Sequence, residues 1–203
     1  METLVQAVMD RLFIPLEASG RHVHLTRETA MTLFGHPLTP QRTLSQPGQF
    51  LAKERLTILG EKGRFTNVAV LGPERDANQV EISLTDGRTL GLNPPVRLSG
   101  QVQGSPGITL EGPLGRVTLP EGVIVARRHV HLTPERAEKL GVTDRQRVRL
   151  QVYTERPLVF QDVTVRVSRE FADYAHLDYD EANACGFTPG DLGRILPQGG
   201  EEL

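Results

Sequence analysis

Short alternating or β-branched apolar runs, separated by glycine and proline, dominate the hydrophobic pattern of the chain. Alternation of apolar and polar residues over about four to eight positions is typical of a half-buried strand. We expect strands at Arg55–Leu59, Phe65–Leu71, Gln79–Leu84, Val96–Val102, Ile108–Leu110, Arg116–Leu119, Val123–Val130, Arg147–Tyr153, Leu158–Phe160 and Val163–Val167. Tight-turn residues such as Glu61–Gly63 and Asp86–Gly87 lie between several of these runs. This pattern predicts a mainly β fold of barrels or sandwiches.

Helical periodicity is confined to a few short segments. The segment Thr3–Phe13 places Leu4, Val8 and Leu12 on one apolar stripe. Thr26 and Thr133 are typical N-caps, because each is followed by a glutamate in the first turn of the expected helix. Two further short helices are expected at Ser168–Ala175 and Asp180–Ala184.

One hexapeptide occurs twice without change, as Arg21–Thr26 and again as Arg128–Thr133. The similarity continues beyond it, at the pairs Glu28 and Glu135, Ala30 and Ala137, and Leu33 and Leu140. The repeat predicts two related units, each a small β-barrel carrying one His-x-His strand end.

Each copy of the hexapeptide carries two histidines two residues apart. Residues two apart in a strand project from the same face, so His22 and His24 point together, as do His129 and His131. Two imidazoles can form half of a tetrahedral metal site, which a carboxylate or a further histidine completes. A lone pair of this kind is usually a solvated or core pair. Its occurrence twice in one context favours two metal sites in an interdomain cleft.

The remaining metal ligands must come from the other histidines or from carboxylates. His36 lies between glycine and proline in a loop, where a surface role is expected. His176 lies among acidic residues, and either a ligand or a surface role suits it. Glu81 faces away from Val80 and Ile82 in its strand, which suits a ligand or a solvated position.

Composition excludes several classes of function. The 203 residues (22.4 kDa) suffice for one large domain or two of about 100 residues. With 23 basic and 25 acidic residues, the net charge of -2 gives little case for nucleic-acid binding, and 5% aromatics without tryptophan disfavour base stacking. No stretch approaches the ~20 apolar residues of a membrane helix.

The cysteine count bounds the compartment and the chemistry. Cys185 is the single cysteine, which excludes an internal disulfide and a multi-cysteine zinc site. This suits the reducing cytoplasm, and the N-terminus has no basic leader of a secretory signal. No basic neighbour lowers the pKa of the thiol, so we expect a structural role for Cys185.

Further motifs follow in order from about Ile14 to Leu196. They are Ser19–Leu25, Val70–Arg75, Gln79–Ser83, Leu98–Gly100, Gly122–Thr133 and His176–Ala184. In order and spacing this set resembles the PduL-type phosphotransacylases, also called phosphate propanoyltransferases. The resemblance implies an enzyme that interconverts a short-chain acyl-CoA plus phosphate with acyl phosphate plus CoA.

The same resemblance implies a fold of two β-barrels capped by short helices, with the active site between them. One barrel would combine residues 14–20 with 127–203, and the other would use 21–126, after an N-terminal helix at 1–13. The family holds two zinc ions per chain. By position, the ligands of the first zinc would be His22, His24 and Glu81, and those of the second His129, His131 and His176.

Substrate contacts also follow from the resemblance. Arg75 would bind phosphate, and the CoA contacts would be Ala18, Ser19, Gly20, Lys62 and Asn183. The chain departs from the family at Ala69, where a CoA-contacting arginine can stand, and at 17–20, where a Val-Ser-Asn run is common. These departures touch CoA affinity and leave the expected metal ligands intact.

Two other classes of function compete with the acyltransferase. His22, His24 and Glu28 imitate the His-x-His-x₃-Glu motif of a cupin-like single-metal oxygenase or isomerase. Against this, Thr26 and Thr133 are expected helix caps, which would put the glutamates on helices. The third class is a zinc-stabilised binding module without catalysis. The sequence selects neither acetyl nor propanoyl nor a longer acyl chain, and leaves a homo-oligomer open.

The segment 1–13 has two interpretations. Some relatives carry an amphipathic N-terminal peptide that directs them into bacterial microcompartments, which would add a shell or lumen partner. Only Ile14 and Pro15 separate the expected helix from the first strand, whereas a targeting peptide usually has a flexible linker. The alternative is a helix that caps its own barrel.

Overall fold

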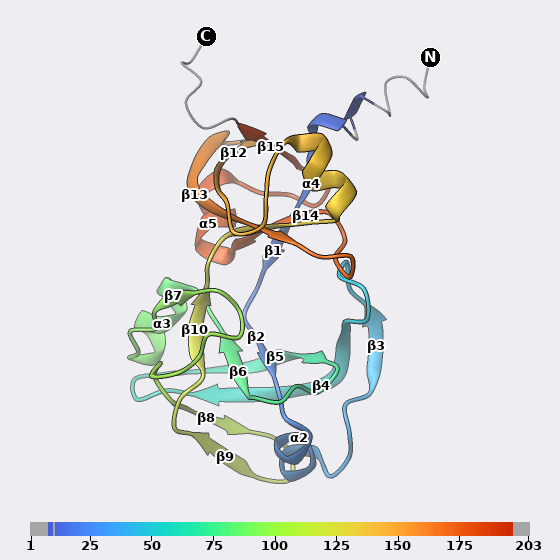
Figure 1. Ribbon diagram of the computed structural model, residues 1–203. Helices are drawn as coiled ribbons and strands as arrows, with labels where there is room; N and C mark the ends of the chain where they lie inside the picture. The colour runs from blue at the N-terminus through green and yellow to red at the C-terminus, as the bar shows by residue number, and fades with distance from the viewer. Residues whose placement is uncertain (1–7, 10, 197–203) are drawn as a thin grey trace. The chain divides into compact units, whose positions relative to one another are not determined.

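The computed structural model describes residues 8, 9 and 11–196 (Figure 1). The chain divides into two compact units, each with its own apolar core. The barrel unit comprises Met1–Ser19 and Arg127–Leu203, and the half-barrel unit comprises Gly20–Ala126. The predicted fold class, mainly β with short helices, is confirmed. None of the described helices is long and apolar enough to cross a membrane.

The barrel unit is a closed six-stranded barrel in the order β1-β14-β11-β13-β12-β15. Its strands are β1 (Ile14–Ser19), β11 (His129–Leu132), β12 (Arg147–Tyr153), β13 (Leu158–Val167), β14 (Tyr174–Asp178) and β15 (Leu192–Leu196). Alternate residues such as Val130, Leu132, Ala175 and Leu177 fill the core. The residues between them therefore lie on the outer face. Two short helices, α4 (Pro134–Leu140) and α5 (Tyr179–Cys185), follow β11 and β14.

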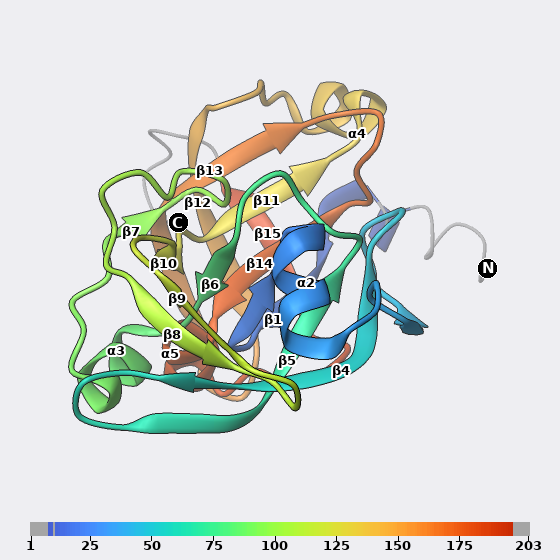
Figure 2. The same cartoon turned by 90° about the horizontal axis from the view of Figure 1, so that it is seen from below.

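The half-barrel unit is built on a curled sheet in the order β7-β10-β6-β2-β5-β4-β8-β9, with β3 paired to β4. Its strands are β2 (His22–His24), β3 (Pro40–Thr43), β4 (Phe50–Leu59), β5 (Arg64–Gly72), β6 (Gln79–Glu81), β7 (Val96–Arg97), β8 (Ile108–Glu111), β9 (Arg116–Leu119) and β10 (Val123–Ala126). Helix α2 (Arg27–Phe34) packs against β9 (Figure 2). Helix α3 (Leu84–Leu90) follows β6.

Both threonines of the duplicated hexapeptide are N-caps, as the sequence predicts. The Thr26 side chain accepts a hydrogen bond from the Thr29 amide, and the Thr133 side chain accepts one from the Arg136 amide. Each helix ends at a glycine in the left-handed region, Gly35 after α2 and Gly141 after α4. Each His-x-His strand therefore runs into a helix of defined start and end.

The predicted helix at Ser168–Ala175 is wrong, because none of these residues is helical and the last two belong to strand β14. Ala175 is in the barrel core, and β14 pairs with β1 on one side and β11 on the other. The predicted strand Gln79–Leu84 is too long, because Ser83 caps helix α3. Gly87 lies inside α3, where a Cβ would come within 2.8 Å of Cδ of Pro94.

Four other predicted strands differ from the structure. The run Val123–Val130 forms β10 and β11, which belong to different units. Only Val96 and Arg97 of the predicted strand Val96–Val102 are in a strand. The two runs at 158–160 and 163–167 form one strand, β13, with Asp162 at φ 56°. Most of the predicted helix Thr3–Phe13 lies outside the described residues, and residues 8, 9, 11 and 12 are helical.

Candidate metal centres

The first candidate centre lies on strands β2 and β6 of the half-barrel unit. These strands pair antiparallel, with His22 opposite Glu81 and His24 opposite Gln79. Val23 points to the other face and packs in the apolar core. Strand alternation therefore places two imidazoles, a carboxylate and an amide on one face, and all four residues are buried.

The geometry of this triad brings acceptors together. The Nδ1 of His22 donates to the Gly20 carbonyl at 2.7 Å, which directs the lone pair of Nε2 at the Glu81 carboxylate, 3.5 Å away. The Nε2 of His24 lies 3.9 Å from the same carboxylate. Lone pairs facing an anion at this distance need a proton or a metal ion between them.

Burial and charge shift the pKa of each member of the first triad. Burial acts to raise the pKa of Glu81, but the charge and hydrogen bond of His22 hold it far below its usual range. Burial acts to lower the pKa of His22, and the Glu81 carboxylate raises it above the usual value. Burial and the charge of His22 lower the pKa of His24 well below its usual value. At neutral pH the Glu81 carboxylate is therefore ionised and the imidazole of His24 is neutral.

A chain of hydrogen bonds leads from this triad to Arg75. Gln79 Nε2 donates to the Glu81 carboxylate and to the Ser99 hydroxyl, the latter at 2.8 Å. The side-chain Oε1 of Gln79 accepts from the Gly100 amide at 2.7 Å, and Arg75 Nη1 lies 3.4 Å from the Ser99 hydroxyl. Burial and the charge of His22 lower the pKa of His24 most, and the charge of the Arg75 guanidinium acts in the same direction.

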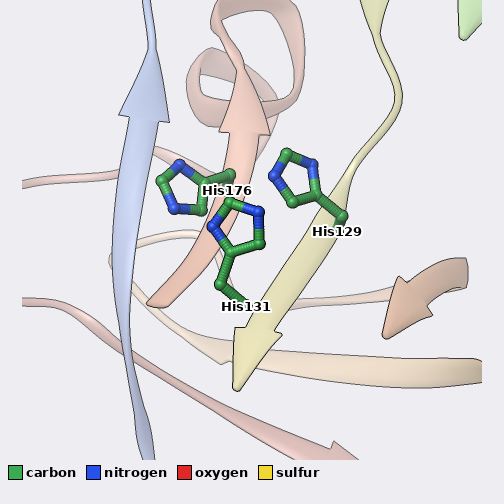
Figure 3. Close-up of side chains that lie close together, drawn as sticks. All are labelled: His129, His131 and His176. Carbon is green, nitrogen blue, oxygen red and sulfur yellow. The ribbon is translucent and has the colours of Figure 1, made fainter. Parts of the chain in front are cut away.

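The second candidate centre lies on strands β11 and β14 of the barrel unit (Figure 3). Here His129 is opposite His176, and Val130 is opposite Ala175 in the core. Figure 3 shows the rings of His129, His131 and His176 gathered beside these two strands. The alternation that fills the barrel core therefore turns three imidazoles outward together.

The ring nitrogens of this second triad suit metal ligation. His129 Nδ1 donates to the Arg127 carbonyl at 2.8 Å. Both ring nitrogens of His131 are buried without a hydrogen-bond partner among the described residues. Burial, then the charges of His129 and His176, lower the pKa of His131 to about 2, so its imidazole is neutral at physiological pH. Phe171 stacks on His131 at 4.0 Å between ring centroids.

Both triads fit a metal ion by donor set and proximity. In each triad one ligand atom from every residue lies within 4.8 Å of the others. Buried nitrogens without partners are costly in an apoprotein, and coordination would satisfy them. Three protein ligands of nitrogen and oxygen type leave a fourth position open, as in catalytic zinc sites.

Sequence reasoning from the residues left the third member of each triad undecided. The structure shows a second repeat, in which Glu81 and His176 occupy the same register position relative to the first histidine. Two residues later each unit has a helix N-cap, Ser83 or Asp178. Three residues before Glu81 or His176, the side chain of Asn78 or Asp173 accepts a hydrogen bond from the backbone amide of the capping threonine. This repeat keeps spacing while residue types change, so a search for identical motifs misses it.

The family model for phosphate propanoyltransferase matches residues 15–188. The chain belongs to the phosphate propanoyltransferase family. It is 52% identical over 204 residues to a phosphate propanoyltransferase of Enterococcus faecalis, covering 97% of both chains. Proteins of the same name from Listeria monocytogenes (54% over 185 residues, 90% of this chain and 87% of the relative) and Thermotoga maritima (51% over 181 residues, 88% and 86%) are also similar.

The CoA contacts that the family resemblance implies lie in both units. Ala18 and Ser19 are at the end of β1, which packs against α5, and Asn183 is exposed on that helix. Gly20 belongs to the half-barrel unit and accepts the hydrogen bond from His22. Lys62 is exposed in the turn between β4 and β5.

Other predicted positions are also placed by the structure. Ala69 is opposite His22 on β5, so the family's occasional arginine would stand on the face of the first triad. Glu28 and Glu135 lie in the first turns of α2 and α4 and are exposed, and neither joins a triad. This arrangement removes the basis of the cupin-like alternative. His36 is exposed, with its Nδ1 at 3.7 Å from Glu54.

Proposed function

We propose that this chain is a phosphate acyltransferase that interconverts a short-chain acyl-CoA plus phosphate with acyl phosphate plus CoA. Membership of the phosphate propanoyltransferase family supports this activity and implies acyl-CoA and phosphate as substrates. The observation that carries the finer proposal is the pair of triads, each with three potential ligand atoms within 4.8 Å of one another. A two-metal enzyme accounts for both triads.

The proposed metal is zinc, with one ion in each triad. His22, His24 and Glu81 would hold the first ion, and His129, His131 and His176 the second. Nitrogen and carboxylate ligands suit zinc. The carbonyls of Gly20 and Arg127 set the tautomers of His22 and His129, because each accepts a hydrogen bond from Nδ1. When bound, zinc supplies a Lewis acid that stabilises anionic oxygen and thiolate sulfur.

Arg75 is the proposed phosphate anchor. A guanidinium offers a planar fork of donors that matches two oxygens of a tetrahedral dianion. Its backbone amide donates to the Leu25 carbonyl at 2.8 Å, and its side chain reaches Ser99, so both ends are positioned by the half-barrel unit. Holding phosphate in this way turns a bimolecular encounter into an oriented attack.

The bond changes follow from the two substrates. A phosphate oxygen attacks the thioester carbon, a C–O bond forms, and the C–S bond breaks to release the CoA thiolate. No acyl-enzyme is needed. Cys185 is buried, and burial raises the pKa of its thiol, so it is not a nucleophile.

CoA is proposed to contact Ala18, Ser19, Gly20, Lys62 and Asn183. Exposed Lys62 offers a positive charge for a CoA phosphate, and exposed Asn183 offers amide donors and acceptors. Because Ala69 lacks the guanidinium found in some relatives, we expect CoA affinity to rest on fewer charged contacts.

Two roles are proposed for residues 1–13, a microcompartment address and a barrel cap. Contacts between Phe13 and the barrel are expected only of a barrel cap. The Phe13 carbonyl accepts a hydrogen bond from Arg136 Nη2 at 2.7 Å, and its ring meets Tyr153 edge-on at 5.3 Å. These contacts support the barrel cap. A microcompartment address and assembly into a homo-oligomer are the further proposals that the family resemblance suggests.

The assay that tests the proposed function is release of CoA thiol from acetyl-, propanoyl- and longer acyl-CoA, with and without phosphate. The proposal expects release that depends on phosphate, with stoichiometric acyl phosphate. Consumption of oxygen by the metal-loaded protein would instead indicate the single-metal oxygenase. Full metal content without turnover of any acyl-CoA would indicate a zinc-stabilised binding module.

A further inference from the structure

The first residue of each duplicated hexapeptide, Arg21 or Arg128, is outside the triads but makes a specific ion pair. Each guanidinium pairs with an acidic side chain in the first turn of the helix that follows the third triad residue. The pairs are Arg21–Asp86 in the half-barrel unit and Arg128–Glu181 in the barrel unit. The same connection is thus built twice from different acids.

In the half-barrel unit the ion pair is bidentate. Arg21 Nε and Nη2 donate to the two carboxylate oxygens of Asp86 at 3.0 and 2.8 Å, and the guanidinium lies 4.1 Å from the Phe65 ring centroid. Asp86 also completes the capping box of α3, because its carboxylate accepts from the Ser83 amide. Ser83 is two residues beyond Glu81. Arg21 therefore ties the start of the His-x-His strand to the segment that carries the carboxylate ligand.

In the barrel unit the same connection uses a glutamate. Arg128 Nη1 donates to Glu181 Oε1 at 2.7 Å, and its Nε donates to the Gln161 carbonyl at 2.7 Å. The other oxygen of Glu181 accepts from the Asp178 amide at 3.2 Å in the capping box of α5. Asp178 is two residues beyond His176. The arginine again precedes the first histidine and reaches the helix beyond the third ligand.

Strand pairing alone holds a ligand weakly where it lies at the end of a short strand. Strand β2 is only three residues long, and His22 is its first residue. A ligand position must be held within about 0.5 Å for a metal to bind tightly, which requires contacts outside the ligands themselves. Asp86 is desolvated, with 7% of its side chain exposed, and a buried carboxylate depends on its partner. A forked ion pair at this point limits the separation of the two ligand-bearing segments.

We propose that Arg21–Asp86 and Arg128–Glu181 are two ligand-positioning pairs, one for each metal site, that set metal affinity without touching the metal. The proposal rests on the metal sites of the proposed function. It differs from a purely structural role in its selectivity. A helix cap or surface ion pair would change the free energy of unfolding, whereas a positioning pair changes the zinc affinity of its own triad and not that of the other.

The experiment measures zinc affinity of the full chain by chelator competition, in two backgrounds that each retain one triad. His129→Ala with His131→Ala leaves the first site, and His22→Ala with His24→Ala leaves the second. Arg21→Gln and Arg128→Gln are then placed in both backgrounds. Arg116→Gln is the matched control, because Arg116 is exposed on the edge strand β9, where it pairs with Glu111 of β8, and strands β5, β4 and β8 separate β9 from β2.

The proposal expects Arg21→Gln to weaken zinc binding at the first site about 10- to 100-fold, the usual cost of losing an outer contact of metal ligands. Arg128→Gln should change that site by less than about threefold, since Arg128 pairs with Glu181 inside the barrel unit. The pattern should reverse in the other background. Arg21→Lys should recover part of the loss, because one donor remains.

Asp86→Asn provides a second route if Arg21→Gln folds poorly. Asparagine keeps an acceptor for the Ser83 amide and removes the ion pair, so its zinc affinity should fall as in Arg21→Gln, with no further loss in the double variant. Unchanged affinity in the folded variants, or equal losses at both sites, would overturn the positioning role. Absence of zinc binding by the unsubstituted chain would instead defeat the metal sites of the proposed function, and the positioning pairs with them.

Discussion

Arg75→Lys removes the forked donor that we propose for phosphate while keeping a positive charge. Lysine offers a point charge in place of two oriented donors, so one charge-assisted contact to the phosphate is lost in the transition state. The contact to the Ser99 hydroxyl at 3.4 Å is also lost, although Gln79 still holds that hydroxyl at 2.8 Å. The perturbation is therefore confined to the phosphate end of the network.

The expected cost is about 2–4 kcal/mol of transition-state stabilisation, by analogy with a lost oxyanion donor. This corresponds to a fall of roughly 30- to 900-fold in kcat/KM for phosphate. Steady-state CoA release at varied phosphate gives this value, and elemental analysis should show unchanged zinc. Arg116→Lys, at an arginine whose side chain is 64% exposed, is the control and should match the unsubstituted enzyme. If Arg75→Lys keeps the phosphate dependence and turnover of the unsubstituted enzyme, Arg75 is not the phosphate anchor.

Three other changes test separate parts of the account. His129→Ala should lose about one zinc ion per chain and most activity, and unchanged metal content by elemental analysis would remove His129 from the ligands. Deleting residues 2–13 should lower the free energy of urea unfolding by about 1–2 kcal/mol if the segment caps the barrel, because Arg136 then loses its charged hydrogen bond to the Phe13 carbonyl; equal stability and activity would favour the microcompartment role. Burial acts to raise the pKa of Glu54, but hydrogen bonds from Thr39 lower it below 4.5, so Glu54 stabilises the fold above that pH and the effect is lost as pH falls through the folded pKa. Glu54→Gln should therefore lose less stability than the unsubstituted chain as pH falls through this range, and an unchanged acid slope would contradict it.

Local patterns predicted the parts of the site that one strand determines. Alternation alone indicates that His22 and His24 share a face, and the identical hexapeptide indicates that the second pair does the same. The third ligands depend on pairing between strands that are distant in sequence, β2 with β6 and β11 with β14. No period in the sequence reports such pairing, so Glu81 and His176 came from the family resemblance.

The errors in the elements have the same origin. Apolar residues lie on both sides of Arg127 and Arg128 in the predicted strand at 123–130. The pattern therefore does not reveal that β10 and β11 belong to separate units. Gly87 is typical of a turn, yet the capping box at Ser83 and the approach of Pro94 place it inside a helix. At these positions tertiary contacts outweigh the local secondary-structure propensity.

The central claim is a two-zinc enzyme that transfers an acyl group between CoA and phosphate. It is tested most directly by measuring CoA release from propanoyl-CoA while zinc is added back to chelator-treated enzyme, with and without phosphate. The account predicts no release without phosphate, and with phosphate a rise that reaches its plateau at about two equivalents of zinc per chain. Release that ignores phosphate, or full activity in the zinc-free enzyme, would contradict it.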